Sequence, residues 1–224
     1  MKAYVKSSSP EALLSWQSSG GAWNDFARDA SSYEPVKAAL RVEQQHLCCY
    51  CEAKLGDDHI EHFWPRHGPH GNASRTFDYT NLGCSCHGGT DRNRHCGHYK
   101  GDQYDPSLFV NPCAENSGRL FAYTVDGGIS YVPGLGAAEQ TRVNYMIRTL
   151  NLACPRLANM RRSYAAGLQA TIQGMIDANA VEQIDDLARF YLTPDEAGKL
   201  HPFFSLSRQL FGTRAEVVLS LLEG

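Results

Sequence analysis

The chain has 224 residues, with 21 Lys and Arg against 24 Asp and Glu and a formal net charge of −3. A hydrophobic fraction of 42% is ordinary for a folded protein and excludes wholesale disorder. Because mean hydropathy is −0.39 and no long apolar run occurs, a transmembrane span is not expected. No apolar segment follows Met1, which argues against a secretory signal, so we expect a cytoplasmic protein.

Residues 1–47 are predicted to form short helices. Pro10 follows Ser9 and suits the first position of a helix. A second helix is predicted over 33–47, where Val36 and Leu40 are spaced to lie on one helical face. This helix leads directly into Cys48.

Residues 48–104 contain few aliphatic residues and many Gly, His and Cys. Six of the 8 Cys and eight of the 9 His of the chain fall between residues 46 and 98. Such a segment cannot close an apolar core by itself, and a bound metal commonly holds small folds of this kind. We predict a strand over 60–64 that ends at Pro65, a loop over 66–75 and a returning turn or strand over 77–82.

The rest of the chain, 105–224, is predicted to contain one hairpin and several helices. Asp126-Gly127-Gly128 separates two strand-like runs at 120–125 and 129–132. A helix is expected from 139, a longer one from Pro155, and two more from the capping-box patterns at Thr193 and Thr213. The predicted fold class is therefore α+β and mostly helical, with the regions 1–47, 48–104 and 105–224 joined in one compact unit.

The cysteine spacing predicts a structural zinc site. Cys48 and Cys51 form a C-x-x-C pair that can bind one side of a tetrahedral zinc ion, and Cys86 with Cys96 can supply the other side. A redox-active pair of the thioredoxin type would need a βαβ context, whereas a predicted helix leads into Cys48. The competitors for the second pair of ligands are Cys84, His87 and His95.

Three further motifs lie in and around this region in a fixed order. They are Glu61-His62 on the predicted strand, Asn81-Leu82, and the run from His95 to Gly101. With the C-x-x-C pair, this order resembles the HNH endonuclease family, which has a ββα-metal motif on a zinc-bound frame. The segments 43–52 and 150–152 extend the resemblance to the PtuB-like subgroup of the Septu and retron-associated anti-phage systems.

The resemblance implies a nuclease that cleaves DNA beside a PtuA-like ABC-type ATPase. Imidazole can accept a proton from water near neutral pH, and the resemblance makes His62 that base. It also implies that Asn81 holds the loop and the His62 strand in place. Neighbouring residues on a strand face opposite sides, so the metal role of Glu61 rests on the resemblance and not on geometry.

The catalytic cation is expected to be Mg²⁺ or Mn²⁺, held by Glu61 and His98, with Lys100 contacting phosphate. In the common pattern of the family the metal-binding residue follows the last Cys directly, and that position is Gly97 here. His95 therefore remains a rival to His98.

The segment 140–176 has five Arg and no acidic residue, so it can also be interpreted as a surface that follows a phosphate backbone or as a solvated helix face. The five are Arg142, Arg148, Arg156, Arg161 and Arg162. Two alternatives stay open: a non-catalytic zinc-ribbon-like binding module in which His62 is structural, and a nuclease of the same type that acts on RNA. Solvated loop positions are expected for His59, His67 and His70.

Overall fold

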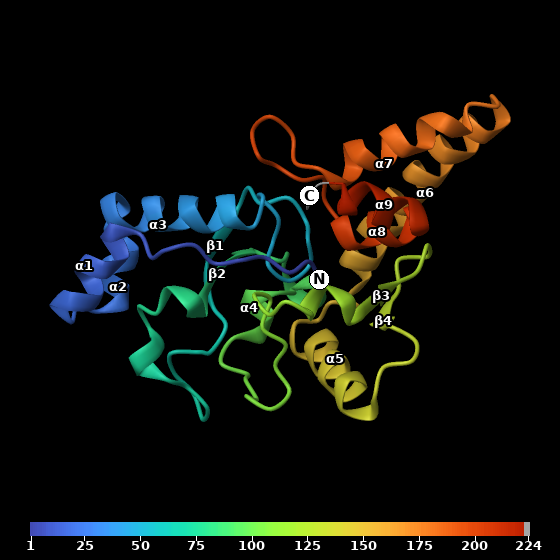
Figure 1. The fold of residues 1–224 in the computed structure, drawn as a ribbon. Helices are drawn as coiled ribbons and strands as arrows, with labels where there is room; N and C mark the ends of the chain where they lie inside the picture. Colours follow the sequence, from blue (N-terminus) through green and yellow to red (C-terminus); the bar gives the residue numbers. More distant parts are fainter. Residues whose placement is uncertain (222–224) are drawn as a thin grey trace.

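The computed structural model describes residues 1–221 and is mostly helical, with two small sheets, which confirms the predicted α+β class (Figure 1). Before the hairpin come helices α1 (Glu11–Ser19), α2 (Trp23–Arg28), α3 (Ala30–Glu43) and α4 (Gly97–Lys100). After it come α5 (Ala137–Thr149), α6 (Pro155–Asp177), α7 (Ile184–Leu192), α8 (Phe204–Phe211) and α9 (Thr213–Ser220). No helix among the described residues combines the length and apolar character needed to cross a membrane.

Strands β1 (Asp58–His62) and β2 (Leu82–Cys86) form an antiparallel pair at the centre of the molecule. Their register sets His62 opposite Leu82 and Asp58 opposite Cys86. The first strand begins two residues earlier than predicted, and the returning strand begins at Leu82, where the prediction over 77–82 ends. A 3-10 turn, Tyr79–Asn81, occupies the end of that predicted segment.

Helices α1–α3 cover one side of this strand pair (Figure 1). Val36 and Leu40 of α3 are fully buried with Ile60 of β1 and Leu82 of β2 in one apolar cluster, as the helical spacing predicts. Phe26 of α2 is also fully buried there. Apolar packing on α3 therefore fixes one face of the strands.

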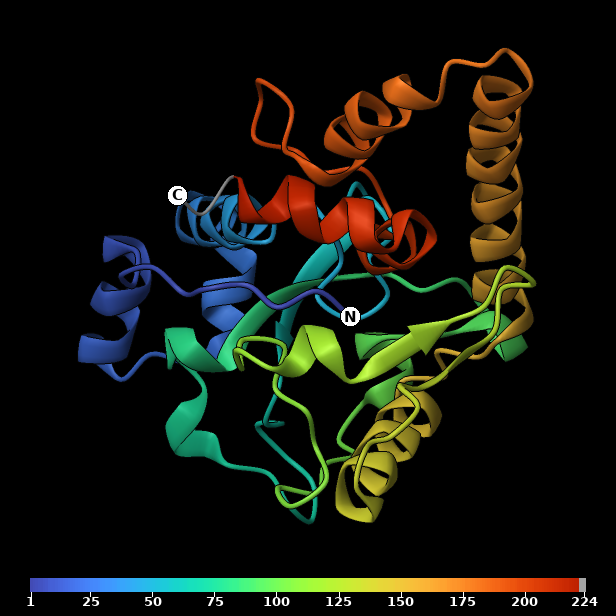
Figure 2. The ribbon, with the colours of Figure 1, turned by 45° about the vertical axis from the view of Figure 1, so that its right-hand side comes forward.

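The other elements lie on the opposite side, where the long helix α6 stands beside α7, α8 and α9 (Figure 2). The hairpin β3 (Phe121–Tyr123) and β4 (Ile129–Tyr131) forms where the sequence predicts it. Its strands pack with α5 and the segment 48–53 in a second apolar cluster. That cluster connects the C-terminal helices to the cysteine-rich segment.

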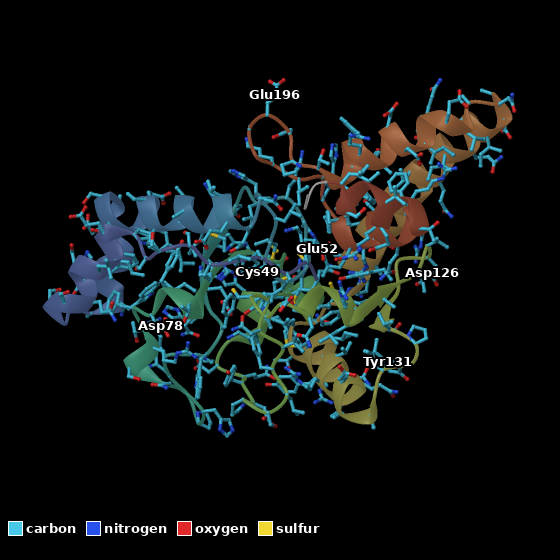
Figure 3. All side chains as sticks on the ribbon, in the orientation of Figure 1. Cys49, Glu52, Asp78, Asp126, Tyr131 and Glu196 are labelled. Atoms are coloured by element: carbon cyan, nitrogen blue, oxygen red, sulfur yellow. The ribbon has the colours of Figure 1, made fainter. Side chains whose placement is uncertain are left out.

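The predicted helix at Thr193 is wrong. The Asp195 side chain accepts hydrogen bonds from the N–H groups of Ala197 and Lys199, which closes a loop in place of a helical turn. Figure 3 shows Glu196 at the far end of this loop. The helix predicted at Thr213 is present as α9.

Candidate metal centre and active site

The structure brings together the four cysteines that the sequence predicts as zinc ligands. One sulfur from each of the four lies within 4.8 Å of the others; they are Cys48, Cys51, Cys86 and Cys96. The Sγ atoms of Cys48 and Cys96 are 3.8 Å apart, and those of Cys51 and Cys86 are 3.7 Å apart. A tetrahedral zinc ion with Zn–S bonds of ~2.3 Å requires sulfur separations of about 3.8 Å, so this set has the geometry of a structural zinc site.

The backbone around these cysteines is shaped to hold them. The Cys48 carbonyl accepts the Glu52 N–H, and the Cys48 N–H donates to the Ala53 carbonyl, which closes a tight turn. The Cys86 N–H points at the Cys48 sulfur, 3.4 Å away, as in a hydrogen bond to a thiolate. In Figure 3, Cys49 and Glu52 of this turn are labelled near the centre of the molecule.

The competing residues take other positions. Cys84 is buried on the side of α3, with its sulfur 3.5 Å from the Lys37 carbonyl. His95 is buried beside the cysteine cluster, where Nε2 lies 3.8 Å from the Cys86 sulfur and Nδ1 lies 2.7 Å from the Asn93 carbonyl. His95 therefore supports the cysteine cluster and does not join His98.

His62 ends β1 and is only 8% exposed. Its Nε2 lies 2.9 Å from the carbonyl oxygen of Thr76. A carbonyl can only accept, so Nε2 carries the proton and Nδ1 keeps a lone pair. Trp23 packs edge-on against the imidazole at 4.3 Å between ring centroids. Burial lowers the pKa of His62 to about 4, which keeps the ring neutral at pH 7.

Asn81 ties together the loop that follows His62. Its side-chain oxygen accepts the Trp64 N–H, and its amide donates to the carbonyls of Trp64 and Arg75. The Phe63 N–H donates to the Asn81 carbonyl as well. These bonds connect the end of β1 to the start of β2, and they hold the segment that carries Thr76.

Glu61 is buried on the opposite face of β1 from His62. Its Oε1 accepts from Lys100 Nζ at 3.0 Å and from the Tyr50 hydroxyl at 3.2 Å. Burial would raise the pKa of Glu61, but the charge of Lys100 and the contact with His59 outweigh it and lower that pKa to about 2. Lys100 is itself 2% exposed and also donates to the His62 carbonyl, so it links Glu61 to the His62 backbone inside the protein.

His59 is not a solvated loop residue, and this expectation is wrong. It lies on β1 two residues before Glu61, on the same face, with Nε2 3.5 Å from Glu61 Oε2. Its ring stacks on that of His98 at 4.1 Å, and His87 lies beside both. The sequence contains a signal for this position: His59 is two residues from Glu61, and residues two apart on a strand face the same side. His67 and His70 are exposed, as expected.

The departure from the common motif at Gly97 has a steric reason. A side chain at this position would overlap the Glu61 carboxylate and the His59 ring. His98, the next residue, lies on α4 against His59.

The five arginines of 140–176 do not share one environment. Arg161 is 1% exposed and donates to the carbonyls of Gly127 and Leu152, so it holds the hairpin turn on α6 and faces no solvent. Arg162 is exposed and donates to the Asp126 carbonyl. Arg148 and Arg156 are exposed. Arg142 is half-buried with a bond to the Phe109 carbonyl.

Arg156 also lines a pocket of about 760 Å³ beside the cysteine cluster. Lys54 and Arg94 line the same pocket, as do His87 and His98. The pocket thus combines cationic side chains with two imidazoles, a composition that suits an anionic ligand.

These features define an α+β protein built on a buried four-cysteine site of zinc geometry, with an antiparallel strand pair and a short helix beside it. The sequence is 27% identical, over 202 residues, to the "Retron Ec83 putative HNH endonuclease" of Escherichia coli, an alignment that covers 72% of this chain and 78% of the relative. No protein-family model matches the chain. The chain is therefore a distant homologue of that protein.

Proposed function

We propose that this chain is a metal-dependent HNH endonuclease that hydrolyses DNA phosphodiester bonds. The observation that carries the proposal is the hydrogen bond from His62 Nε2 to the Thr76 carbonyl, because it leaves a neutral ring with an unprotonated Nδ1. A histidine retained only as a buried structural group would be better served by partners on both nitrogens. This favours a nuclease over a non-catalytic zinc-ribbon-like module.

In the proposed reaction, His62 Nδ1 takes the proton of the attacking water. Asn81 keeps the loop and Thr76 in place, so the ring stays in the tautomer that the reaction needs. Burial against Trp23 keeps His62 neutral and ready to accept the proton. General-base catalysis of this kind contributes about 10²- to 10⁴-fold in rate.

A divalent cation is proposed at His98, next to Glu61, as the metal of the reaction. When bound, it would supply Lewis-acid stabilisation of the phosphate and the leaving oxygen. Glu61 Oε1 already accepts from Lys100 and Tyr50, and only Oε2 faces His59 and Gly97. Lys100 is buried and paired with Glu61, so it is not available to contact phosphate. We therefore assign the phosphate contact to exposed cations.

Those exposed cations are Lys54, Arg94, Arg148 and Arg156. Three of them border the pocket that contains His87 and His98. Lysine and arginine side chains neutralise phosphates without reading bases, so they support backbone binding without sequence preference. A net charge of −3 for the whole chain is compatible with DNA binding, because cationic side chains outnumber acidic ones in the lining of this pocket.

The proposed biological setting is anti-phage defence beside a PtuA-like ABC-type ATPase, in the PtuB-like subgroup. Two observations support it: the motif order around 43–101 and the similarity to a protein that is named for a retron. The physical chemistry of the site does not by itself specify the ATPase.

The test is cleavage of supercoiled plasmid, with an RNA of matched length as a second substrate. The full chain is assayed alone and with a PtuA-like ATPase, with and without divalent cation. His62→Ala is expected to lower cleavage at least about 10²-fold while the cysteine site keeps its metal. The matched control is His67→Ala, an exposed histidine outside the site. Equal cleavage by His62→Ala and wild type would contradict the assignment of the base, and cleavage of RNA alone would move the substrate to RNA.

A further inference from the structure

We infer that His59, His87 and His98 form a second metal site that takes a transition-metal ion such as Zn²⁺, Co²⁺ or Ni²⁺ rather than Mg²⁺. One ring nitrogen from each of the three lies within 4.8 Å of the others. The residues come from β1, from the segment after β2 and from α4, so the fold brings them together from three places. The inference deepens the proposed nuclease function by naming the ligands and the kind of metal.

The nitrogen of His87 that faces His98 is available for a metal. His87 Nε2 lies 3.0 Å from Asp57 Oδ1, so Nε2 carries the proton and Nδ1 keeps a lone pair. Nδ1 of His87 is 3.3 Å from Nδ1 of His98. Two nitrogens bound to one tetrahedral ion at ~2.0–2.1 Å would be separated by about 3.3 Å. Nδ1 of His98 also lies 3.1 Å from the His87 carbonyl oxygen, so a metal ion between the two rings would take the place of the proton that His98 donates there.

Carboxylates orient two of the three imidazoles. Asp57 holds His87 in this way, and Glu61 Oε2 lies 3.5 Å from Nε2 of His59. Metal-bound histidines characteristically donate their other N–H group to a carboxylate, which fixes the ring and raises its basicity. His59 Nδ1 is also buried and has no hydrogen-bond partner among residues 1–221. The His59 ring lies against the rings of His87 and His98, and this unpaired nitrogen is the one that remains free to bind a metal.

The number of ligands is that of a metal site with an exchangeable ligand, rather than that of a structural metal site. Three protein ligands leave a fourth position open, whereas the four cysteines close their own site. The 760 Å³ pocket, bordered by His87 and His98, gives access to that position. Lys54, Arg94 and Arg156 line it, so the ligand that completes the coordination is expected to be anionic, as a phosphodiester is.

The donor atoms decide which metal is bound. Mg²⁺ prefers oxygen ligands in an octahedral arrangement, and the three side chains offer only nitrogen. Imidazole suits zinc, cobalt, nickel and copper, with affinities that rise along the first transition series to copper. Glu61 acts here as the orienting partner of His59, because Lys100 and Tyr50 already engage its other oxygen.

The test is metal stoichiometry of the untagged full chain by mass spectrometry, after exposure to Zn²⁺ and dialysis. We expect about two zinc ions per chain for wild type and about one for the double variant H87A/H98A, with the remaining ion in the cysteine site. The control H67A/H70A alters two exposed loop histidines and should keep about two. Calorimetric titration should show binding of Zn²⁺ but not of Mg²⁺ to wild type that already holds its cysteine-bound zinc.

One zinc per chain in wild type, or two in H87A/H98A, would overturn the inference. A thermal melt of H87A/H98A, with its cysteine-bound zinc retained, shows that the variant is folded. Cleavage is measured on the same samples. Activity with Mg²⁺ and a single bound zinc would contradict the second metal site but not the nuclease function. Two bound ions without cleavage would support the second metal site and count against the nuclease function.

Discussion

The imidazole of His62 is held by the carbonyl of Thr76, 2.9 Å from Nε2, across the loop between β1 and β2. The two residues are 14 positions apart, and the side chain of Asn81 maintains the loop that brings them together. The bond and the packed ring of Trp23 keep His62 buried and neutral.

The stability of the protein should fall with acid more steeply than that of a His62→Gln variant. Burial lowers the pKa of His62 from 6.5 to about 4, so between these values the unfolded chain takes up a proton that the folded chain excludes. The stabilisation is complete above pH 6.5 and is lost as pH falls toward 4. It amounts to about 3.5 kcal/mol at most, at about 1.4 kcal/mol per pH unit.

Glutamine can keep a donor to Thr76 but does not titrate, so the difference between the two proteins isolates His62. Urea unfolding at pH 7, 6 and 5 provides the measurement. Parallel pH profiles for wild type and His62→Gln would show that His62 titrates with its ordinary pKa and would contradict the burial effect.

The four-cysteine site should contribute most of the stability of the region 48–104. Cys51→Ser is expected to lose the metal and at least about 3 kcal/mol, because metal binding to such a site is folding free energy. This corresponds to a fall in Tm of about 6–12 °C for a chain of this size. Calorimetry and metal analysis give the two readouts. Cys113→Ser is the control, because Cys113 is half-buried outside the cluster and should retain the metal. A stable, metal-replete Cys51→Ser protein would refute the zinc frame.

The ligands of this frame could be predicted from sequence because thiolate spacing is a local signal. The register of the strands, which decides the face that each residue occupies, could not be predicted in this way. Gly83 and Cys84 have little intrinsic preference for a strand, and β2 exists because it pairs with β1. The placement of His59 follows from that pairing: one residue of strand register decides whether it faces solvent or α4.

The role of arginines also depends on tertiary structure. Arg156 and Arg161 are five residues apart on α6 and equal in charge, but one lines a pocket and the other is buried under the hairpin turn. Sequence composition cannot separate them. A distinction of this kind requires the position of Gly127 relative to the helix.

These two arginines should give opposite results when each is replaced by alanine. Arg156→Ala is expected to change stability by less than about 0.5 kcal/mol and to weaken DNA binding, with the salt dependence of log K reduced by about 1. Arg161→Ala should cost about 3 kcal/mol, because the carbonyls of Gly127 and Leu152 lose charged donors. Fluorescence anisotropy at several salt concentrations and urea unfolding check the two effects. Equal loss of DNA affinity in both folded variants would place Arg161 on the binding surface.

Gly97 should tolerate no side chain. A Cβ at this position would overlap the Glu61 carboxylate and the ring of His59, two groups already fixed by Lys100 and His98. Gly97→Ala is therefore expected to destabilise the protein by about 1–3 kcal/mol, the usual cost of overpacking, and to displace Glu61. Gly167→Ala is the matched control, since Gly167 lies exposed in α6 with nothing within 4 Å of its Cβ position. Alanine there should instead stabilise the helix by about 0.5–1 kcal/mol. Urea unfolding of both variants measures the contrast. If Gly97→Ala were as stable as wild type, α4 would not pack against Glu61 as closely as the structure has it, and the steric reason for glycine at this position would fail.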